Sequence, residues 1–103
     1  MELTEQQIII KEFEEINYKI TNKEINTFID KVYKDLYIVI TTDANKLSFE
    51  ILNKYNNKTL FKSKEIPYYK ISFDNIDIFV DLIDRFLKDF YLLVDFNYTI
   101  NMQ

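Results

Sequence analysis

The chain contains no glycine and a single proline, Pro67, among its 103 residues. Glycine and proline are the residues that most readily build tight turns, so the turns here must be built from Asn, Asp and Lys. The lack of glycine also removes the glycine-rich loops that cradle nucleotide phosphates and the dinucleotide-binding fingerprint. The sequence therefore excludes the enzyme classes that depend on those two motifs.

Cysteine and histidine are also absent. Disulfides, thiolate metal sites and thiol nucleophiles are therefore excluded, and so are Ser-His catalysis and imidazole metal ligands. Hydroxyls, carboxylates and lysines remain, but no pattern places such a pair at a strand end or at a backbone anion site. We expect a protein that is not an enzyme and that uses no metal and no cofactor.

Length and apolar content predict one folded domain, residues 1–103, because 48% of the chain is apolar and can form a core. No apolar run approaches the roughly 18 residues that span a bilayer, and no basic stretch precedes an apolar one as in a signal peptide. Ile, Lys, Asn, Phe and Tyr, whose codons are AT-rich, make up 55 residues. We expect a cytoplasmic protein of a bacterial host, without membrane contact, from a low-GC bacterium, its phages or its mobile elements.

Two N-terminal segments have apolar residues at helical spacing. Thr4 and Gln7 form a capping-box pattern, which predicts a helix over about 5–18. Thr21 and Glu24 repeat this pattern before apolar residues at 25, 28, 29, 32, 33 and 36, which predicts a second helix over about 22–35. Thr21 is the only break between them, so the sequence leaves open whether residues 5–35 form one bent helix or two.

The apolar period then changes from about 3.6 to 2, which indicates strands. We predict strands over 37–42, 46–55, 58–64 and 68–73, the last at an edge because it follows Pro67. The pair Asn56-Asn57 suits a two-residue hairpin turn, because Asn tolerates positive φ.

A third helix is predicted over about 75–90, with Asp74 as its cap, and a final half-buried strand from Val94 to Met102. The order α-α-β-β-β-β-α-β predicts an α+β fold, a mostly antiparallel sheet with the helices packed on one face. The expected core consists of Phe28, Ile29, Val32, Phe49, Ile51, Phe79, Val80 and Ile83.

Charge is divided unevenly along the chain, although its net value is −4. Residues 1–35 carry a net charge of −3, residues 36–73 carry +3 and residues 74–103 carry −4. The predicted helices thus present an acidic face: Asp74, Asp77, Asp81, Asp84, Glu12, Glu14 and Glu15. The predicted sheet presents a basic face: Lys46, Lys54, Lys58, Lys62, Lys64, Tyr68 and Lys70.

Each face can be an ordinary solvated surface or a binding surface. The acids on a helix can simply be solvated, but residues four apart lie about 6 Å from one another, close to a phosphate repeat, and can occupy a basic protein surface. The lysines can discourage aggregation of the sheet, or they can hold single-stranded nucleic acid. We favour the acidic face as the partner-binding surface, because the single arginine, Arg85, argues against base recognition.

We therefore expect a non-enzymatic, stoichiometric protein-binding inhibitor or adaptor. An anti-defence protein of a phage or mobile element, such as an anti-CRISPR protein, would have this character, and its protein partner would be a host nucleic-acid-handling complex. Two alternatives remain: an immunity protein or antitoxin, and a nucleic-acid-binding module that uses the basic face. The sequence leaves open the identity of the partner and the formation of a homodimer.

Overall fold

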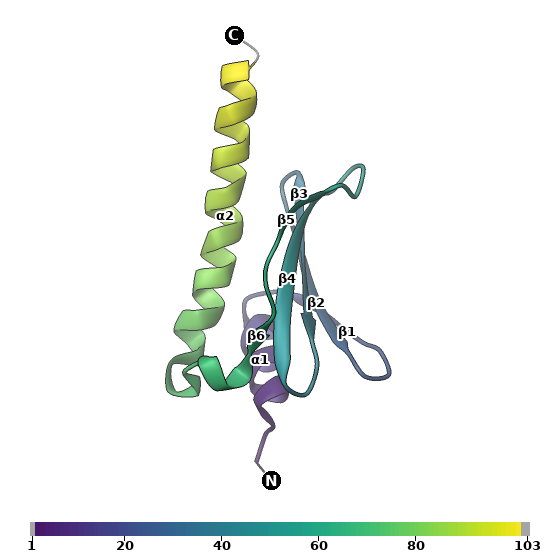
Figure 1. Ribbon diagram of the computed structural model, residues 1–103, viewed down its shortest axis with the longest axis vertical. Coiled ribbons are helices and arrows are strands. Elements are labelled where there is room, and N and C mark those ends of the chain that lie inside the picture. The colour runs from purple at the N-terminus through teal and green to yellow at the C-terminus, as the bar shows by residue number, and fades with distance from the viewer. Residues whose placement is uncertain (1, 102–103) are drawn as a thin grey trace.

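An antiparallel sheet with two helices on one of its faces forms the structure (Figure 1). The computed structural model describes the backbone of residues 2–101 and the side chains of residues 2–94. This is the α+β fold predicted from the sequence, but the element order is α-β-β-β-β-β-β-α. The elements are α1 (Glu5–Glu15), β1 (Lys19–Asn22), β2 (Thr27–Tyr33), β3 (Leu36–Thr42), β4 (Lys46–Asn53), β5 (Thr59–Lys62), β6 (Ile66–Pro67), the short 3-10 helices η1 (Tyr68–Lys70) and η2 (Phe73–Asn75), and α2 (Ile76–Asn101).

Helix α1 begins with the predicted capping box. The Thr4 hydroxyl accepts a hydrogen bond from the Gln7 backbone N–H at 3.1 Å, and the Thr4 N–H donates to the Gln7 side chain at 2.8 Å. The helix ends at Glu15, earlier than the predicted residue 18, because Asn17 adopts a left-handed backbone with φ of 70°. Asn is one of the few residues other than glycine that accepts this conformation at a helix end.

The predicted helix over 22–35 is wrong, because these residues form the β1–β2 hairpin and the turn into β3. Ile29 lies between Ile20 of β1 and Ile40 of β3 in the register of the sheet. The segment Thr27–Tyr33 is rich in β-branched and aromatic residues, which fit a pleated surface as well as a helix. Pairing with β3 over its whole length satisfies the backbone groups of both strands and decides between the two.

The sheet is a meander in the order β1-β2-β3-β4-β5, and β6 pairs with the other end of β4. The strands predicted over 37–42, 46–55 and 58–64 correspond to β3, β4 and β5, with β4 and β5 shorter than expected. Asn57 has the expected positive φ, 59°, but the connection between β4 and β5 covers residues 54–58, so the predicted two-residue turn is wrong. Lys34 also takes a positive φ, 54°, in the two-residue turn between β2 and β3.

The predicted strand over 68–73 is also wrong, because these residues form η1 and the start of η2. Tyr68 turns into the core, where its hydroxyl donates a hydrogen bond to the Asp43 carbonyl at 2.5 Å. Tyr69, by contrast, is 82% exposed. This irregular segment carries the chain from the edge of the sheet to the start of α2.

Helix α2 begins at Ile76, close to the predicted residue 75, but it continues to Asn101. The expected strand from Val94 is therefore wrong over residues 94–101, and residue 102 lies outside the described residues. A helix that has already formed gains one hydrogen bond for each residue it adds, and no proline interrupts the segment after residue 90. Within residues 2–101, no helix has the length and apolar character needed to cross a bilayer.

The core lies between the helices and one face of the sheet. Buried residues come from α1, from the inner sides of β2, β3 and β4, and from α2: Ile9, Phe13, Ile29, Leu36, Ile38, Ile40, Leu47, Ile51, Val80, Ile83 and Leu87. Of the predicted core, Phe49 and Phe79 are only partly buried, although they pack against it. Phe28 and Val32 were predicted wrongly, because strand alternation turns them to the other face of the sheet.

The two faces of β2 can be compared by mutation. Ile29→Ala removes a fully buried side chain and should lower the free energy of unfolding by about 2–5 kcal/mol. Val32→Ala, at a position that is 50% exposed, should cost about 1 kcal/mol or less. Urea unfolding followed by circular dichroism measures both values, and equal large losses would mean that residues 27–33 do not form this strand.

Candidate functional site

A groove lined by three apolar residues and four carboxylates lies between α1 and α2. Its volume is about 290 Å³, and we call it the acidic groove. Its lining residues are Glu12, Glu15, Ile16, Asp77, Ile78, Val80 and Asp81. Four of the seven residues predicted for the acidic face are thus brought together, from segments about 60 positions apart in the sequence.

Helix geometry places these carboxylates on the two sides of the groove. Glu12 and Glu15 are three residues apart near the end of α1, and Asp77 and Asp81 are four residues apart in the first turns of α2. Residues at these spacings share one face of a helix. Because both helices pack on the same face of the sheet and contact each other, their acidic faces meet.

The groove is strongly negative. Asp81 pairs with Arg85 at 3.2 Å, and among the described side chains no ion pair involves Glu12, Glu15 or Asp77. A concave surface that carries one sign of charge concentrates its field on an approaching ligand. Within the described residues, no three acidic side chains converge as metal ligands would. The groove therefore presents separate carboxylates beside apolar surface.

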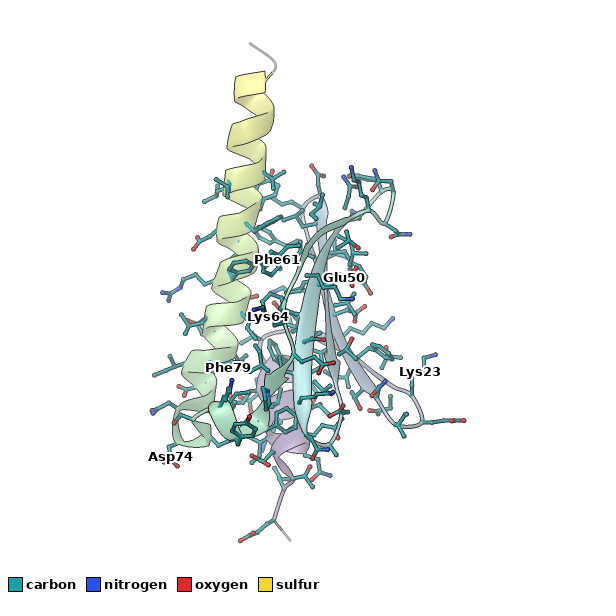
Figure 2. The ribbon with its side chains drawn as sticks, viewed as in Figure 1. Lys23, Glu50, Phe61, Lys64, Asp74 and Phe79 are labelled. Atoms are coloured by element: carbon teal, nitrogen blue, oxygen red, sulfur yellow. The ribbon has the colours of Figure 1, made fainter. Side chains whose placement is uncertain are left out.

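Three residues predicted for the acidic face lie elsewhere. Glu14 is exposed on α1 but does not line the groove, and Asp74 is exposed in η2, at the turn before α2 (Figure 2). Asp84 was expected on the solvated face of α2, and this placement is wrong. Its side chain is only 9% exposed, because position 84 faces the sheet beside Val80 and Leu87.

Asp84 is the centre of a buried polar cluster that joins α2 to the sheet. The Tyr18 hydroxyl donates a hydrogen bond to Asp84 Oδ1 at 2.8 Å. Lys31 Nζ of β2 lies 3.4 Å from the same oxygen, and Lys88 Nζ lies 3.1 Å from Oδ2. Lys31 also lies 4.9 Å from the centre of the Tyr18 ring. Each oxygen of the buried carboxylate thus has a positively charged partner.

The pKa values of this cluster follow from its contacts. Burial acts to raise the pKa of Asp84, but hydrogen bonds from Tyr18 and Lys88 and the charges of Lys31 and Lys88 outweigh it and lower that pKa below 3.8. Burial and the Asp84 carboxylate raise the pKa of Tyr18. The Asp84 carboxylate also raises the pKa of Lys88. The carboxylate stays charged and the phenol and ammonium keep their protons, so the cluster is suited to holding α2 in place.

The predicted basic face does not form as one surface. Lys46 and Lys62 lie on the open face of the sheet, where Lys62 is opposite Glu50 and Lys46 pairs with Glu65 at 2.8 Å. Figure 2 shows Glu50 on the side of the sheet that faces away from α2. The other residues predicted for this face lie in the β4–β5 turn, after β5, in η1 or in the core: Lys54, Lys58, Lys64, Lys70 and Tyr68.

The open face of the sheet is instead more apolar than the sequence suggested. Phe28, Val32, Tyr37, Val39 and Leu52 project from it. The Tyr37 hydroxyl donates to one carboxylate oxygen of Asp30, and burial together with this contact raises the pKa of Tyr37 to about 12. Alternation within residues 27–33 was the signal for this surface, but it was masked by the helical spacing of the same residues.

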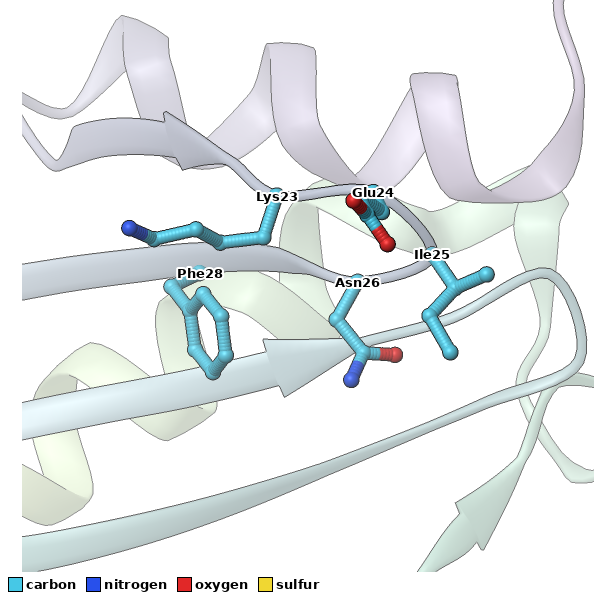
Figure 3. Close-up of a pocket in the computed structure, with 5 residues that line it drawn as sticks. All are labelled: Lys23, Glu24, Ile25, Asn26 and Phe28. Carbon is cyan, nitrogen blue, oxygen red and sulfur yellow. The ribbon is translucent and has the colours of Figure 1, made fainter.

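A wider hollow of about 550 Å³ lies at the connection between β1 and β2 (Figure 3). It is lined by Lys23, Glu24, Ile25, Asn26 and Phe28. Figure 3 shows the side chains of Lys23 and Ile25 extending to opposite sides of the loop. A binding site for a small molecule usually has several polar groups that converge on an apolar cavity, and this loop does not provide them.

The acidic groove is therefore the strongest candidate among these surfaces. Comparisons with protein families, with curated proteins and with solved structures found no match to this chain. The function is accordingly inferred from the charge, lining and location of the groove.

Asp84 and Asp81 give a matched test of the buried cluster. Asp84→Asn removes the charge that Lys31 and Lys88 require and should lower the free energy of unfolding by about 1–3 kcal/mol. Asp81→Asn breaks only the exposed pair with Arg85 and should cost about 0.5 kcal/mol or less. Chemical denaturation at neutral pH measures both, and equal losses would contradict the structural role of Asp84.

The contribution of Asp84 should also depend on pH. Its pKa is below 3.8 in the folded chain, so the unfolded chain takes up a proton first as the pH falls. The stabilisation is therefore complete well above pH 3.8 and is lost as the pH falls through the folded value. The stability difference between the wild type and Asp84→Asn should narrow over this range in urea unfolding curves.

Proposed function

We propose that this protein acts without catalysis, by binding a basic and partly apolar segment of a protein partner in the acidic groove. The observation that carries this proposal is the meeting of four carboxylates from two helices around Ile16, Ile78 and Val80. Carboxylates alone would be an ordinary solvated surface. Apolar residues between them provide the contact area that a surface of charges does not.

Charge and apolar contact have different roles in such a complex. Long-range attraction between the groove and a cationic surface increases the association rate and selects the orientation. Burial of apolar side chains then slows dissociation, because exposed ion pairs contribute little net affinity. The proposed binding should therefore weaken, but not vanish, as salt screens the charges.

Proteins that handle nucleic acids are basic where they contact phosphates, so they form a partner class suited to this groove. Residues three or four apart on a helix have Cβ atoms about 6 Å apart, which is close to the spacing of phosphates along a strand. A protein that occupies such a surface acts stoichiometrically, as an inhibitor or adaptor. An anti-defence protein of a phage or mobile element is the specific form we favour, and an immunity protein or antitoxin would use the same contact.

Nucleic acid itself has less support as the ligand. Lys62 is opposite Glu50 in the sheet, and Asp30 lies on the same open face, two strands from Glu50. These carboxylates reduce the attraction of the face for phosphate.

The groove can be tested with a short amphipathic peptide of Lys and Leu residues as a probe. Combined Glu12→Gln, Glu15→Gln, Asp77→Asn and Asp81→Asn substitutions should raise the dissociation constant by about tenfold at low salt, because four attractive charges are lost. Amide NMR shifts of the labelled wild-type protein should change mainly at the groove residues.

A control variant carries Glu2→Gln, Glu14→Gln, Glu24→Gln and Asp74→Asn, which changes the net charge equally at exposed positions outside the groove. This variant should retain most of the affinity. Equal weakening by both sets would show a non-specific charge effect and contradict the groove. Tighter binding of a single-stranded oligonucleotide than of the peptide would favour the nucleic-acid alternative.

Stoichiometry tests the non-catalytic part of the proposal once a partner is identified. Because the proposed action is occupancy of a surface, its effect should rise with the molar ratio and level off near one groove per binding site. Titration of the effect against protein concentration measures this. Many partner molecules altered by each copy of the protein would contradict it.

A further inference from the structure

The exposed side of α2 carries a row of four residues, Leu82, Arg85, Asp89 and Leu92, which we call the α2 seam. Their spacing of three, four and three residues is that of a coiled-coil seam, which keeps side chains on one face of a helix. Leu82 is 55% exposed and Leu92 is 62% exposed. The seam lies opposite the buried residues Val80 and Leu87, so it faces away from the sheet.

The residue types of the seam are arranged symmetrically about Leu87, except that the two central side chains have opposite charges. A leucine stands at each end, and a cation and an anion stand between them at equal distances from Leu87. Two such helices that run antiparallel about Leu87 place Leu82 opposite Leu92 of the other copy. They also place Arg85 opposite Asp89 of the other copy, and the two-fold axis makes each pair occur twice.

We propose that two copies of this chain form an antiparallel dimer through the α2 seam. The charges of Arg85 and Asp89 favour a second copy of this chain as the partner and fix the antiparallel orientation of its α2. Parallel helices in the same register would place Arg85 against Arg85 and Asp89 against Asp89, which is repulsive. Antiparallel helices replace both repulsions with attractive pairs, so a second copy supplies the complement that the seam requires.

The shape of the molecule fits this arrangement. Figure 1 shows α2 extending past the end of the sheet, beyond Phe90 and Tyr91, which still pack against Phe61 and Tyr33. The helix has 26 residues and is therefore about 39 Å long, and Leu87 is near its middle. In the antiparallel dimer, the projecting half of each α2 lies along the first half of the other.

Apolar side chains beside the seam enlarge the contact. Phe86 and Leu93 flank it on one side, at 36% and 58% exposure. Phe86 is already held by Phe61 of β5, with ring centres 4.9 Å apart, so its orientation is fixed before association. A row of exposed leucines with an ordered aromatic beside it is the kind of apolar patch that marks an interface between proteins.

None of the four seam residues lines the acidic groove, although Ile78 of the groove lies four residues before Leu82 on the same side of α2. Arg85 also keeps its pair with Asp81 at 3.2 Å within the chain. Asp89 of the second copy would approach the same guanidinium, which has five N–H donors and can hold two carboxylates.

A charge-swap experiment on the full chain tests the direction as well as the existence of the dimer. Sedimentation equilibrium should show the wild type as a dimer at about 100 μM. Arg85→Asp alone and Asp89→Arg alone should each raise the dissociation constant by about tenfold, because both symmetry-related pairs become repulsive. The double variant, Arg85→Asp with Asp89→Arg, should return to within about threefold of the wild type.

Association of the two single variants with each other, measured after mixing, would not occur if either variant were misfolded. The Arg85→Asp chain carries two negative charges in its seam, and the Asp89→Arg chain carries two positive charges. A heterodimer of the two variants should therefore form in preference to either homodimer. Leu82→Glu should abolish association, and Ile25→Glu provides the matched control, because Ile25 is 83% exposed in the β1–β2 connection, outside the seam. Circular dichroism checks that each variant remains folded.

Three results would overturn the proposal. They are a wild type that remains monomeric at about 1 mM, single charge variants that associate as tightly as the wild type, and mixed single variants that do not associate. An equal effect of Ile25→Glu and Leu82→Glu would likewise place the interface elsewhere.

Discussion

Strand β3 buries every second side chain along its whole length, and the rest of the structure depends on this alternation. Its buried residues, Leu36, Ile38, Ile40 and Thr42, define the face that both helices must cover. Because β3 pairs on both sides, β2 and β4 take the same alternation from its register. A segment with helical spacing is held in strand form at β2, since a central strand without a partner would leave its backbone groups unsatisfied.

Coverage of one face by two helices creates both the acidic groove and the buried cluster around Asp84. Their contact joins the acidic end of α1 to the acidic start of α2 and forms the groove. The same packing turns Asp84 inward, where Lys31, Lys88 and Tyr18 compensate its charge. A single stripe of aspartates on α2 is thereby divided between the buried Asp84 and the acidic groove.

Because α2 is long, the acidic groove and the α2 seam are centred on different parts of it. Its first turns line the acidic groove, and its exposed side carries the seam further along. In the proposed dimer, the two grooves lie toward opposite ends of the helix pair.

The sequence by itself determined the α+β class, the capped start of α1, the alternating strands β3 and β4 and the start of α2, because these depend on local spacing and capping. It also determined that turns would use residues such as Asn57, since glycine is absent. Only the tertiary structure decided that residues 27–33 form a strand, because their pattern suits both helix and strand and pairing with β3 selects the strand. It also decided that α2 continues past Val94, where the pattern again suits both and propagation of the existing helix selects the helix. The acidic residues were predicted as one face, but their division between the groove and the buried Asp84 cluster depends on how α1 and α2 meet. Such a contact between distant segments leaves no local signal in the chain.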